Sequence, residues 1–306
     1  MDRRFSRAFC AGVVAALLAA CSNSQPPFAA LGTMPQSGLS ATQVKRAGQS
    51  HGYNHTLLYV TSGEAFMAYH YPKGKSSSVV AYFAGTYRIC ADKNGNVFLS
   101  TSEGLLEYPH DGANAIATFG VTGACSVDPV TGSLAVCGGD VAVFPYSEQH
   151  GWLLPKERYP GFEVSDCGYD NQGNLFVAGR DSGYAFQFAE LPAKSKTFTS
   201  ITLDQSISEA GPVQWDGSYI TLEDAGAKPS VLYRFSIAGS TGQTVGSTVL
   251  KGTKQVYQYW IQGNKVSGST NLGVNVWPYP AGGKPITQIA LPSGGGGVTV
   301  SVAPKS

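Results

Sequence analysis

The feature that most constrains this chain is a strand–turn–strand pattern that recurs along it. Its fullest copy covers residues 167–192 (CGYDNQGNLFVAGRDSGYAFQFAELP), where an apolar strand leads into the turn DNQGN and two further strands follow. Glycine and asparagine suit the positive φ that such a turn needs. Related turns place their glycines at Gly95, Gly132, Gly173, Gly217 and Gly263. A spacing of about 40 residues with several strands in each repeat is typical of β-propeller blades.

A second marker predicts six copies of the repeat. An aromatic residue ends the third strand of each copy, at Tyr71, Tyr108, Phe144, Phe188, Phe235 and Trp277. We expect these rings to pack between blades, because neighbouring blades must bury their faces against each other. A ring of ligand-stacking aromatics is the alternative interpretation.

The first copy lacks an inner strand, and the missing strand is predicted at the other end of the chain. Residues 57–61 and 66–71 would form its second and third strands. Residues 298–302 (VTVSV) alternate as an inner strand should, after a flexible glycine run at 294–297. Pairing of this tail into blade 1 would remove two exposed strand edges. We therefore predict an all-β, six-bladed β-propeller over residues 51–306, closed by its C-terminal strand.

The N-terminus predicts export and a lipid anchor. Residues 1–20 combine a basic front with a short apolar run, as signal peptides do. The sequence LAAC at residues 18–21 resembles the lipobox of bacterial lipoproteins, which implies cleavage before Cys21 and acylation of its thiol. Ordinary cleavage after small residues is the alternative. Residues 21–50, rich in Ser, Gln, Pro and Gly, are interpreted as a tether. Ser22 resembles the outer-membrane sorting pattern, so we expect a monomer anchored at the bacterial cell envelope, in the outer membrane or at the cell surface.

Charge excludes one class of partner. Removal of residues 1–20 takes away three arginines and Asp2, which leaves 18 basic and 19 acidic residues from the 21 and 20 of the full chain. A net charge of −1 argues against nucleic acid as a partner. The expected partners are therefore the membrane, through the lipid, and a protein or small-molecule ligand that the sequence does not identify.

The turns CSVDPVTGSLAV and CGYDNQGNLFV resemble exported six-bladed propellers of the NHL and gluconolactonase-like group. That group contains lactonases, lyases and pure binding modules. Its lactonases hold a metal ion with Glu, Asn and Asp at the channel mouth. The inner strands predicted here carry a different set, namely Arg88, Cys125, Asp166, Gln214, Tyr259 and Ser301. We therefore favour a binding or scaffolding module without a required cofactor, and keep a metal-dependent lactonase or lyase as the alternative.

Nucleophilic hydrolysis receives no support from the sequence. The motif G-x-S-x-G occurs once, as GQSHG at residues 48–52, ahead of the predicted strands and not at the strand-to-helix turn where a nucleophilic serine of this kind stands. The chain has five histidines, at His51, His55, His70, His110 and His150. None of them is predicted at the channel mouth. His51 and His55 are four residues apart, but Gly52 and Asn54 make a helical metal pair unlikely to form there. No catalytic residue or metal ligand is assigned.

The cysteines suggest a link between blades. Cys125 and Cys167 stand three residues before the aligned Asp128 and Asp170, so they occupy the same place on neighbouring inner strands. An exported chain can form disulfides, and we predict a Cys125–Cys167 pair. Cys90 is one position out of this register and should face the other way. Buried free thiols are the alternative, because neighbouring inner strands can be too far apart for a disulfide.

Acidic residues gather at one predicted end of the blades. The loops joining second to third strands, and those leading into inner strands, are expected on one face of the ring. These segments carry Glu64, Glu103, Asp140, Asp181, Asp224, Glu163, Asp166 and Glu209. Such a face would concentrate cations, with Ca²⁺ or Mg²⁺ as candidates. The alternative is that these carboxylates only decorate solvated turns, where Asp is common.

Substitution of Cys21 by Ser tests the anchor. We expect Cys21→Ser to move the protein from the membrane fraction to the soluble envelope or culture fraction, because the acyl chains carry the whole hydrophobic attachment. Cell fractionation followed by immunoblotting measures this. A variant that stays in the membrane pellet would show that the lipobox interpretation is wrong.

Overall fold

The computed structural model describes residues 55–304. The chain divides into two units, Met1–Val44 and Lys45–Ser306, and the described residues belong to the second. The predicted signal peptide, Cys21, the tether and His51 lie outside the described residues. Within residues 55–304 every regular element is a β-strand, so no helix there could cross a membrane.

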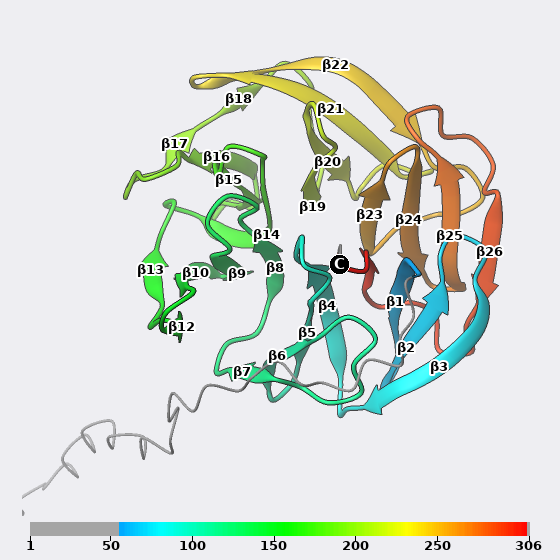
Figure 1. Ribbon diagram of the computed structural model, residues 1–306. Helices are drawn as coiled ribbons and strands as arrows, with labels where there is room; N and C mark the ends of the chain where they lie inside the picture. The colour runs from blue at the N-terminus through cyan, green and yellow to red at the C-terminus, as the bar shows by residue number, and fades with distance from the viewer. Residues whose placement is uncertain (1–54, 305–306) are drawn as a thin grey trace, which may run out of the picture. The chain divides into compact units, whose positions relative to one another are not determined.

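Six sheets stand in a ring around a central axis, as predicted (Figure 1). Each sheet is a blade, and each blade runs from an inner strand at the axis to an outer strand at the rim. Blade 1 contains β27 (Val298–Ser301), β1 (Leu57–Ser62), β2 (Ala65–His70) and β3 (Lys75–Tyr82). Blade 2 contains β4 (Thr86–Ala91), β5 (Val97–Thr101), β6 (Gly104–Tyr108) and β7 (Ala117–Phe119). Blade 3 contains β8 (Ala124–Val127), β9 (Leu134–Gly138), β10 (Asp140–Phe144) and β13 (Lys156–Arg158).

The second half of the chain repeats this order with one addition. Blade 4 contains β14 (Glu163–Tyr169), β15 (Leu175–Arg180), β16 (Phe186–Leu191) and β17 (Thr199–Ser200). Blade 5 contains β19 (Ala210–Trp215), β20 (Ile220–Asp224), β21 (Val231–Ala238) and β22 (Thr241–Val249), with β18 (Thr202–Leu203) added parallel to β22. Blade 6 contains β23 (Gln258–Gln262), β24 (Lys265–Thr270), β25 (Gly273–Pro278) and β26 (Thr287–Ala290). A small hairpin of β11 (Tyr146–Ser147) and β12 (Gly151–Trp152) lies within the blade 3 segment.

The C-terminal strand closes the ring as the sequence predicted. β27 pairs antiparallel with β1, from Leu57 opposite Ser301 to Val60 opposite Val298. In Figure 1 the red end of the chain accordingly lies near the centre of the ring, beside the blue strand β1. The first and last parts of the propeller therefore share one sheet, and unfolding either part would open the ring.

The glycine run before β27 is not the flexible linker that we expected. The amide of Gly296 donates to the carbonyl of Thr61 at 2.7 Å, and the amide of Gly297 donates to the Thr61 hydroxyl at 2.6 Å. A Cβ on Gly297 would lie 2.2 Å from the side chain of Ile89. Glycine is needed here because the backbone passes closely between blades 6, 1 and 2, and a larger residue would push them apart.

The core lies between the blades, where the repeated aromatics pack. Tyr108, Phe144, Phe188, Phe235 and Trp277 belong to apolar clusters formed by facing blades, and Tyr71 packs against the cluster between blades 6 and 1. Phe235 and Trp277 are fully buried. The prediction that these rings pack rather than line a ligand site is confirmed.

The predicted Cys125–Cys167 disulfide is wrong, and the pairs are Cys90–Cys125 and Cys137–Cys167. Cys125 and Cys167 do share one register, but side chains in the same register point the same way around the ring. Cys125 packs against blade 2 beside Phe98, and Cys167 packs against blade 3 beside Ala135. They therefore cannot meet each other.

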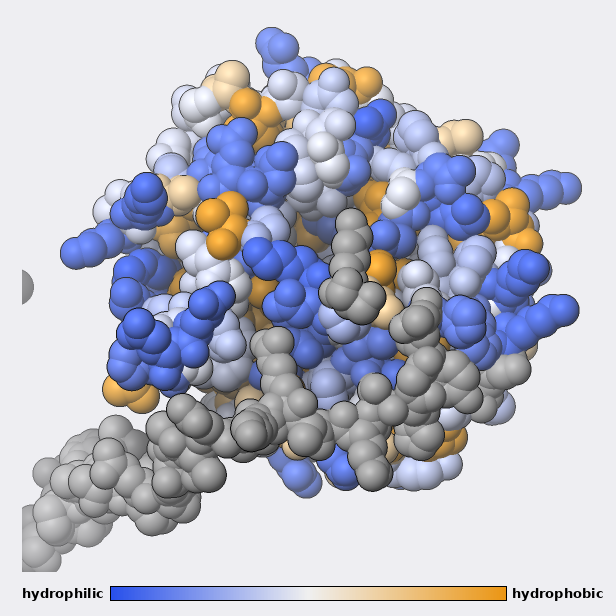
Figure 2. Space-filling model, viewed as in Figure 1, coloured by the Kyte–Doolittle hydropathy of each residue, from blue (hydrophilic) through white to orange (hydrophobic). Residues whose placement is uncertain are grey.

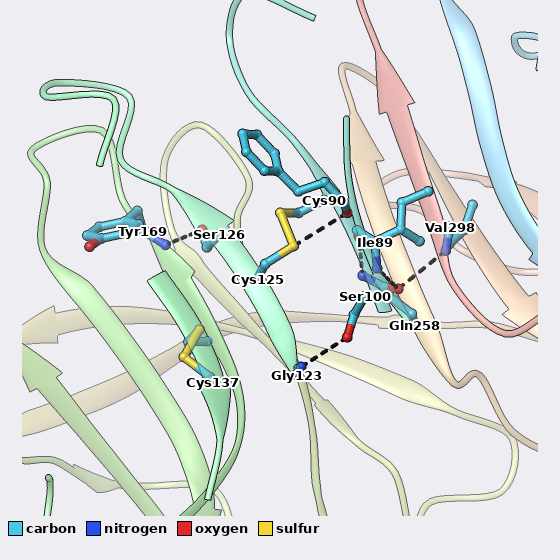
Figure 3. The surroundings of a disulfide bond; sticks show 12 residues. Ile89, Cys90, Ser100, Gly123, Cys125, Ser126, Cys137, Tyr169, Gln258 and Val298 are labelled. Carbon is cyan, nitrogen blue, oxygen red and sulfur yellow. Dashed lines mark hydrogen bonds between the residues drawn. A yellow bond between two sulfur atoms is a disulfide. The ribbon is translucent and has the colours of Figure 1, made fainter. Parts of the chain in front are cut away.

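The register offset of Cys90 explains its partner. Being one position out, Cys90 points forward to blade 3 and meets Cys125, with 5.7 Å between their Cα atoms (Figure 3). Cys137 lies on the second strand of blade 3 and forms a disulfide with Cys167 of blade 4, with 6.2 Å between their Cα atoms. Both separations fit disulfide geometry. The two bonds join blades 2, 3 and 4 in series.

Deletion of the closing strand tests this architecture. Removal of residues 298–306 should lower the melting temperature far more than removal of residues 22–50, because Val298 and Val300 are almost fully buried. Burial of each such side chain contributes about 1.5–3 kcal/mol, and β1 would lose its inner partner. Differential scanning calorimetry of both truncated proteins measures the difference. Equal melting temperatures would contradict the role of β27.

Candidate functional site

The propeller has two different faces at the ends of its channel. Inner strands begin at the first face, where the loops between second and third strands also lie, since Glu163 pairs with Arg180 and Ala210 with Asp224. We call this the loop face. Inner strands end at the opposite face in the repeated tight turns, and we call this the turn face. The grouping of loops that the sequence predicted is thus present.

The eight candidate acidic residues have separate local roles rather than one shared site. Six lie at loops or strand ends of the loop face, and Glu163 forms an ion pair with Arg180 at 3.2 Å. Asp181 accepts the amides of Gly183 and Ala185 within its own loop. Among residues 55–304, no three His, Cys, Asp or Glu side chains are grouped as a metal ion would require. Binding of Ca²⁺ or Mg²⁺ at Glu64, Glu103, Asp140 or Glu209 stays a prediction.

The other two of the eight, Asp166 and Asp224, are buried. Asp224 accepts hydrogen bonds from the hydroxyl of Ser208 at 2.5 Å and from the amides of Ser208 and Glu209 at 3.2 Å. Its carboxylate therefore organises the segment leading into β19. Asp166 lies on the inner strand β14 and reaches the channel.

A pocket opens into the channel from the turn face. Its volume is about 400 Å³, and blades 1 to 6 all contribute to its wall. This volume lies within the range of about 300–1,000 Å³ typical of small-molecule sites. Residues at its rim, such as Lys93, Asn171 and Gln262, stand where inner strands pass into turns. Asp166 is the only one of the eight candidate acidic residues in this wall.

One side of the pocket is aromatic and the other is small. Tyr169 of blade 4 and Trp215 of blade 5 each stand directly before the Asp of the repeated turn, and Trp260 comes from blade 6. The positions equivalent to Tyr169 are Ala91 in blade 2 and Val127 in blade 3. Because the side chains of Ala91 and Val127 are small, they leave the pocket open beside the aromatic side chains. Around the ring, the surface drawn in Figure 2 is mostly hydrophilic with scattered hydrophobic residues.

The charged groups at the rim are engaged by the protein itself. Asp170 accepts the amides of Gln172 and Asn174 at 2.8 and 2.9 Å and the side-chain amide of Asn174 at 2.8 Å. Asp92 accepts the amide of Asn96 at 2.7 Å in the equivalent turn. Lys93 donates to the carbonyl of Pro129 at 2.7 Å. These contacts hold the turns in shape, and a charged ligand would have to compete with them.

Two buried carboxyl groups interact with Arg88, namely Asp166 on the inner strand β14 and Glu223 on the second strand β20. Burial raises the pKa of Asp166 to about 6, although the Arg88 charge and the Val213 amide oppose this rise. Burial also raises the pKa of Glu223 to about 8, partly opposed by the Arg88 charge, and neither carboxyl oxygen of Glu223 has a hydrogen-bond partner among the described residues. The Arg88 guanidinium donates to the carbonyl of Tyr257 across the channel. Arg88 thus offsets only part of the effect of burial on both acids.

A serine–histidine pair that the sequence did not predict lies beside the channel. His110 Nδ1 is 2.6 Å from the hydroxyl of Ser301 on β27, and both residues are buried. The Ser301 hydroxyl donates to the carbonyl of Gly95 at 2.6 Å, so it accepts from His110 Nδ1. A nucleophile needs a base that takes its proton. The opposite polarity here makes this pair a link between blades 1 and 2.

Sequence reasoning missed the pocket, because it looked for a site on the loop face. One signal was available: the residue before the turn Asp is aromatic only in blades 4 and 5. The neighbouring inner strands had been located correctly, since Arg88, Cys125, Asp166, Gln214, Tyr259 and Ser301 all lie on them. What the alignment could not give was which of these positions face the channel.

Comparisons with known proteins support the fold alone. The sequence matches no protein-family profile and no curated protein. A protein of unknown function from Bacteroides caccae is similar in structure, with a TM-score of 0.58 and 13% identity over 81% of this chain and 99% of that one. TolB from Acinetobacter baumannii is similar with a TM-score of 0.53 and 15% identity over 73% of this chain. This chain covers 61% of that TolB chain.

The buried acids predict how stability depends on pH. The folded pKa values of Asp166 and Glu223 exceed the ordinary values of 3.8 and 4.5, so the unfolded chain loses these protons first. The free energy of unfolding should therefore fall as the pH rises from about 4 to 8. At about 1.4 kcal/mol per pKa unit, Asp166 accounts for a loss of about 3 kcal/mol.

Urea unfolding at pH 5, 6.5 and 8 measures this slope. Asp166→Asn, which keeps an oxygen acceptor for the Val213 amide, should flatten the lower part of the curve, and Glu223→Gln the upper part. Glu103→Gln, on an exposed turn, is the matched control and should leave the slope unchanged. Variants as pH-dependent as the wild-type protein would refute the assignment.

Proposed function

We propose that this protein is a binding module whose ligand occupies the central pocket at the turn face. The observation that carries the proposal is the wall of that pocket, where Tyr169, Trp215 and Trp260 border a hollow of about 400 Å³. A concave site lined by apolar and aromatic side chains with a few polar groups is the usual form of a small-molecule site. Blades 4, 5 and 6 hold these side chains on their inner strands.

We further propose that the propeller acts outside the cytoplasm on a lipid anchor at Cys21. Two disulfides within one domain support an oxidising compartment, because cytoplasmic thiols are kept reduced. The structural similarity to a TolB propeller is consistent with this location. The lipobox-like sequence at residues 18–21 supports the anchor. Ser22 supports the outer membrane, and the Ser, Gln, Pro and Gly content of residues 21–50 supports a tether.

A binding role is favoured over metal-dependent catalysis by the chemistry of the pocket wall. The lactonases of the gluconolactonase-like group need several oxygen ligands at the channel mouth. The carboxylates of Asp92 and Asp170 accept backbone amides of their own turns, and the Asp166 carboxyl group accepts the Val213 amide at 3.1 Å. The side chains of this wall do not fit the metal that such an enzyme would hold.

Closing the pocket tests the proposal. Asn171 is exposed, lines the pocket and stands in a turn, so Asn171→Trp should obstruct the opening without disturbing the core. Gln172→Trp, at the adjacent exposed position outside this pocket, is the matched control. The melting temperature is measured with a panel of saccharides, nucleosides, amino acids, Ca²⁺ and Mg²⁺. We expect a ligand in this panel to raise the melting temperature of the wild-type and control proteins and to leave that of Asn171→Trp unchanged.

Two results would count against this assignment. If every stabilising ligand shifts Asn171→Trp as much as wild type, the ligand binds elsewhere on the protein. If only Ca²⁺ or Mg²⁺ stabilises the protein, and Glu209→Gln abolishes the effect while Asp111→Asn does not, the site is the acidic loop face instead.

A further inference from the structure

We propose that the ligand of the central pocket is a neutral saccharide. This inference rests on the proposed function of that pocket and adds the chemical class of the ligand. Three features of the wall carry it: its flat aromatic faces, the engagement of its charged groups by the protein, and the neutral polar groups that are left without a partner.

Aromatic side chains line one side of the pocket. Tyr169, Trp215 and Trp260 are each only partly buried, and all three line the pocket. The C–H faces of a sugar ring pack well on such rings, because aromatic side chains combine a large apolar face with a polar edge. Ala91 and Val127 stand opposite, so the space next to these rings is not filled by other side chains.

The charges of the wall are not free to bind an ionic ligand. The carboxylates of Asp92 and Asp170 accept backbone amides, and the Lys93 ammonium donates to the Pro129 carbonyl. Asp166 is balanced by Arg88 and accepts the Val213 amide. A phosphorylated or quaternary ammonium ligand would therefore have to compete with these contacts for the charged atoms of the wall.

The polar groups that remain are uncharged. Trp260 Nε1 is buried and has no hydrogen-bond partner among the described residues. Trp260 packs against the cluster between blades 2 and 3 and against that between blades 6 and 1, so its ring spans part of the channel. A buried N–H without an acceptor is unfavourable, and a ligand oxygen would satisfy it.

The carboxamides of Asn171 and Gln262 stand at the rim with no side-chain hydrogen bond to residues 55–304. A carboxamide both donates and accepts, and so does a sugar hydroxyl. An indole N–H, two carboxamides and flat ring faces are thus matched by one kind of molecule, a polyol with apolar faces. The combination is less suited to an aliphatic ligand, which would leave these polar groups unpaired.

Binding of defined sugars tests this inference. The full-length mature protein is titrated with chitobiose, cellobiose and maltose, with adenosine, tetramethylammonium and glucose 6-phosphate as probes of other chemistry. Saturation-transfer NMR detects binding, and tryptophan fluorescence gives the affinity. We expect a disaccharide to bind and to be excluded by Asn171→Trp but not by Gln172→Trp.

Trp260→Phe separates ligand binding from packing, because it keeps a ring and removes the N–H. It should weaken disaccharide binding about tenfold, the equivalent of one hydrogen bond. Trp152→Phe is the control, since the Trp152 N–H donates to Glu107 outside this pocket. It should leave the affinity unchanged.

The outcomes distinguish this inference from the function on which it rests. If adenosine, tetramethylammonium or glucose 6-phosphate binds, the three sugars do not, and Asn171→Trp blocks binding, the saccharide inference is overturned and the pocket still binds a ligand. If a sugar binds equally well to wild type, Asn171→Trp and Trp260→Phe, the inference is overturned because the sugar binds elsewhere. If none of the six probes binds at millimolar concentration, it is overturned as well.

Discussion

The fold depends on hydrogen bonds that cross every boundary between blades near the axis. The hydrogen-bond ladder of each blade ends at its inner strand. The edge of that strand that faces the channel would otherwise leave backbone groups unpaired. A side chain of the preceding blade partners the next blade's backbone in each case: Ser100 with Gly123, Ser126 with Tyr169, Asp166 with Val213, Gln214 with Ile261, Gln258 with Val298, and Ser301 with Gly95. Figure 3 shows three of these links around the Cys90–Cys125 bond. Apolar packing alone is not directional, so these bonds fix how the blades meet.

This requirement explains the burial of the Asp166 carboxyl group. Asp166 supplies the link between blades 4 and 5, and its burial raises its pKa to about 6. The positive charge of Arg88 interacts with Asp166 and with Glu223, and makes the rise in pKa that burial causes smaller for both. Gln258 serves the same linking role without a charge, since it donates to the Ile89 carbonyl and accepts the Ile89 amide. The stability of the ring is therefore coupled to pH at the boundary between blades 4 and 5, and the Gln258 link between blade 6 and blades 1 and 2 carries no such coupling.

The closed ring is also what creates the pocket. Tyr169, Trp215 and Trp260 come from three blades, and small residues border them only because blades 2 and 3 stand across the axis. The disulfides join blades 2, 3 and 4 on one side, and β27 joins blade 1 to the end of blade 6 on the other. The distance between the aromatic and the small wall is thus set by covalent and strand-pairing links. Such a preorganised site loses little conformational entropy when it binds.

The sequence by itself determined the architecture, because the spacing of turn glycines and third-strand aromatics reports a local unit of known size. It also located β27 as the missing strand, since alternation and the absence of an inner strand before Leu57 are both local patterns. It could not determine the cysteine pairs, because register tells which side chains point the same way but the meeting partner lies on another blade. The flexible reading of residues 294–297 failed for a related reason: glycine marks a close approach as well as a free joint, and only the packing of Thr61 and Ile89 decides between them. The pocket was decided by tertiary structure alone, since its walls are distant in the chain and meet only when the ring closes.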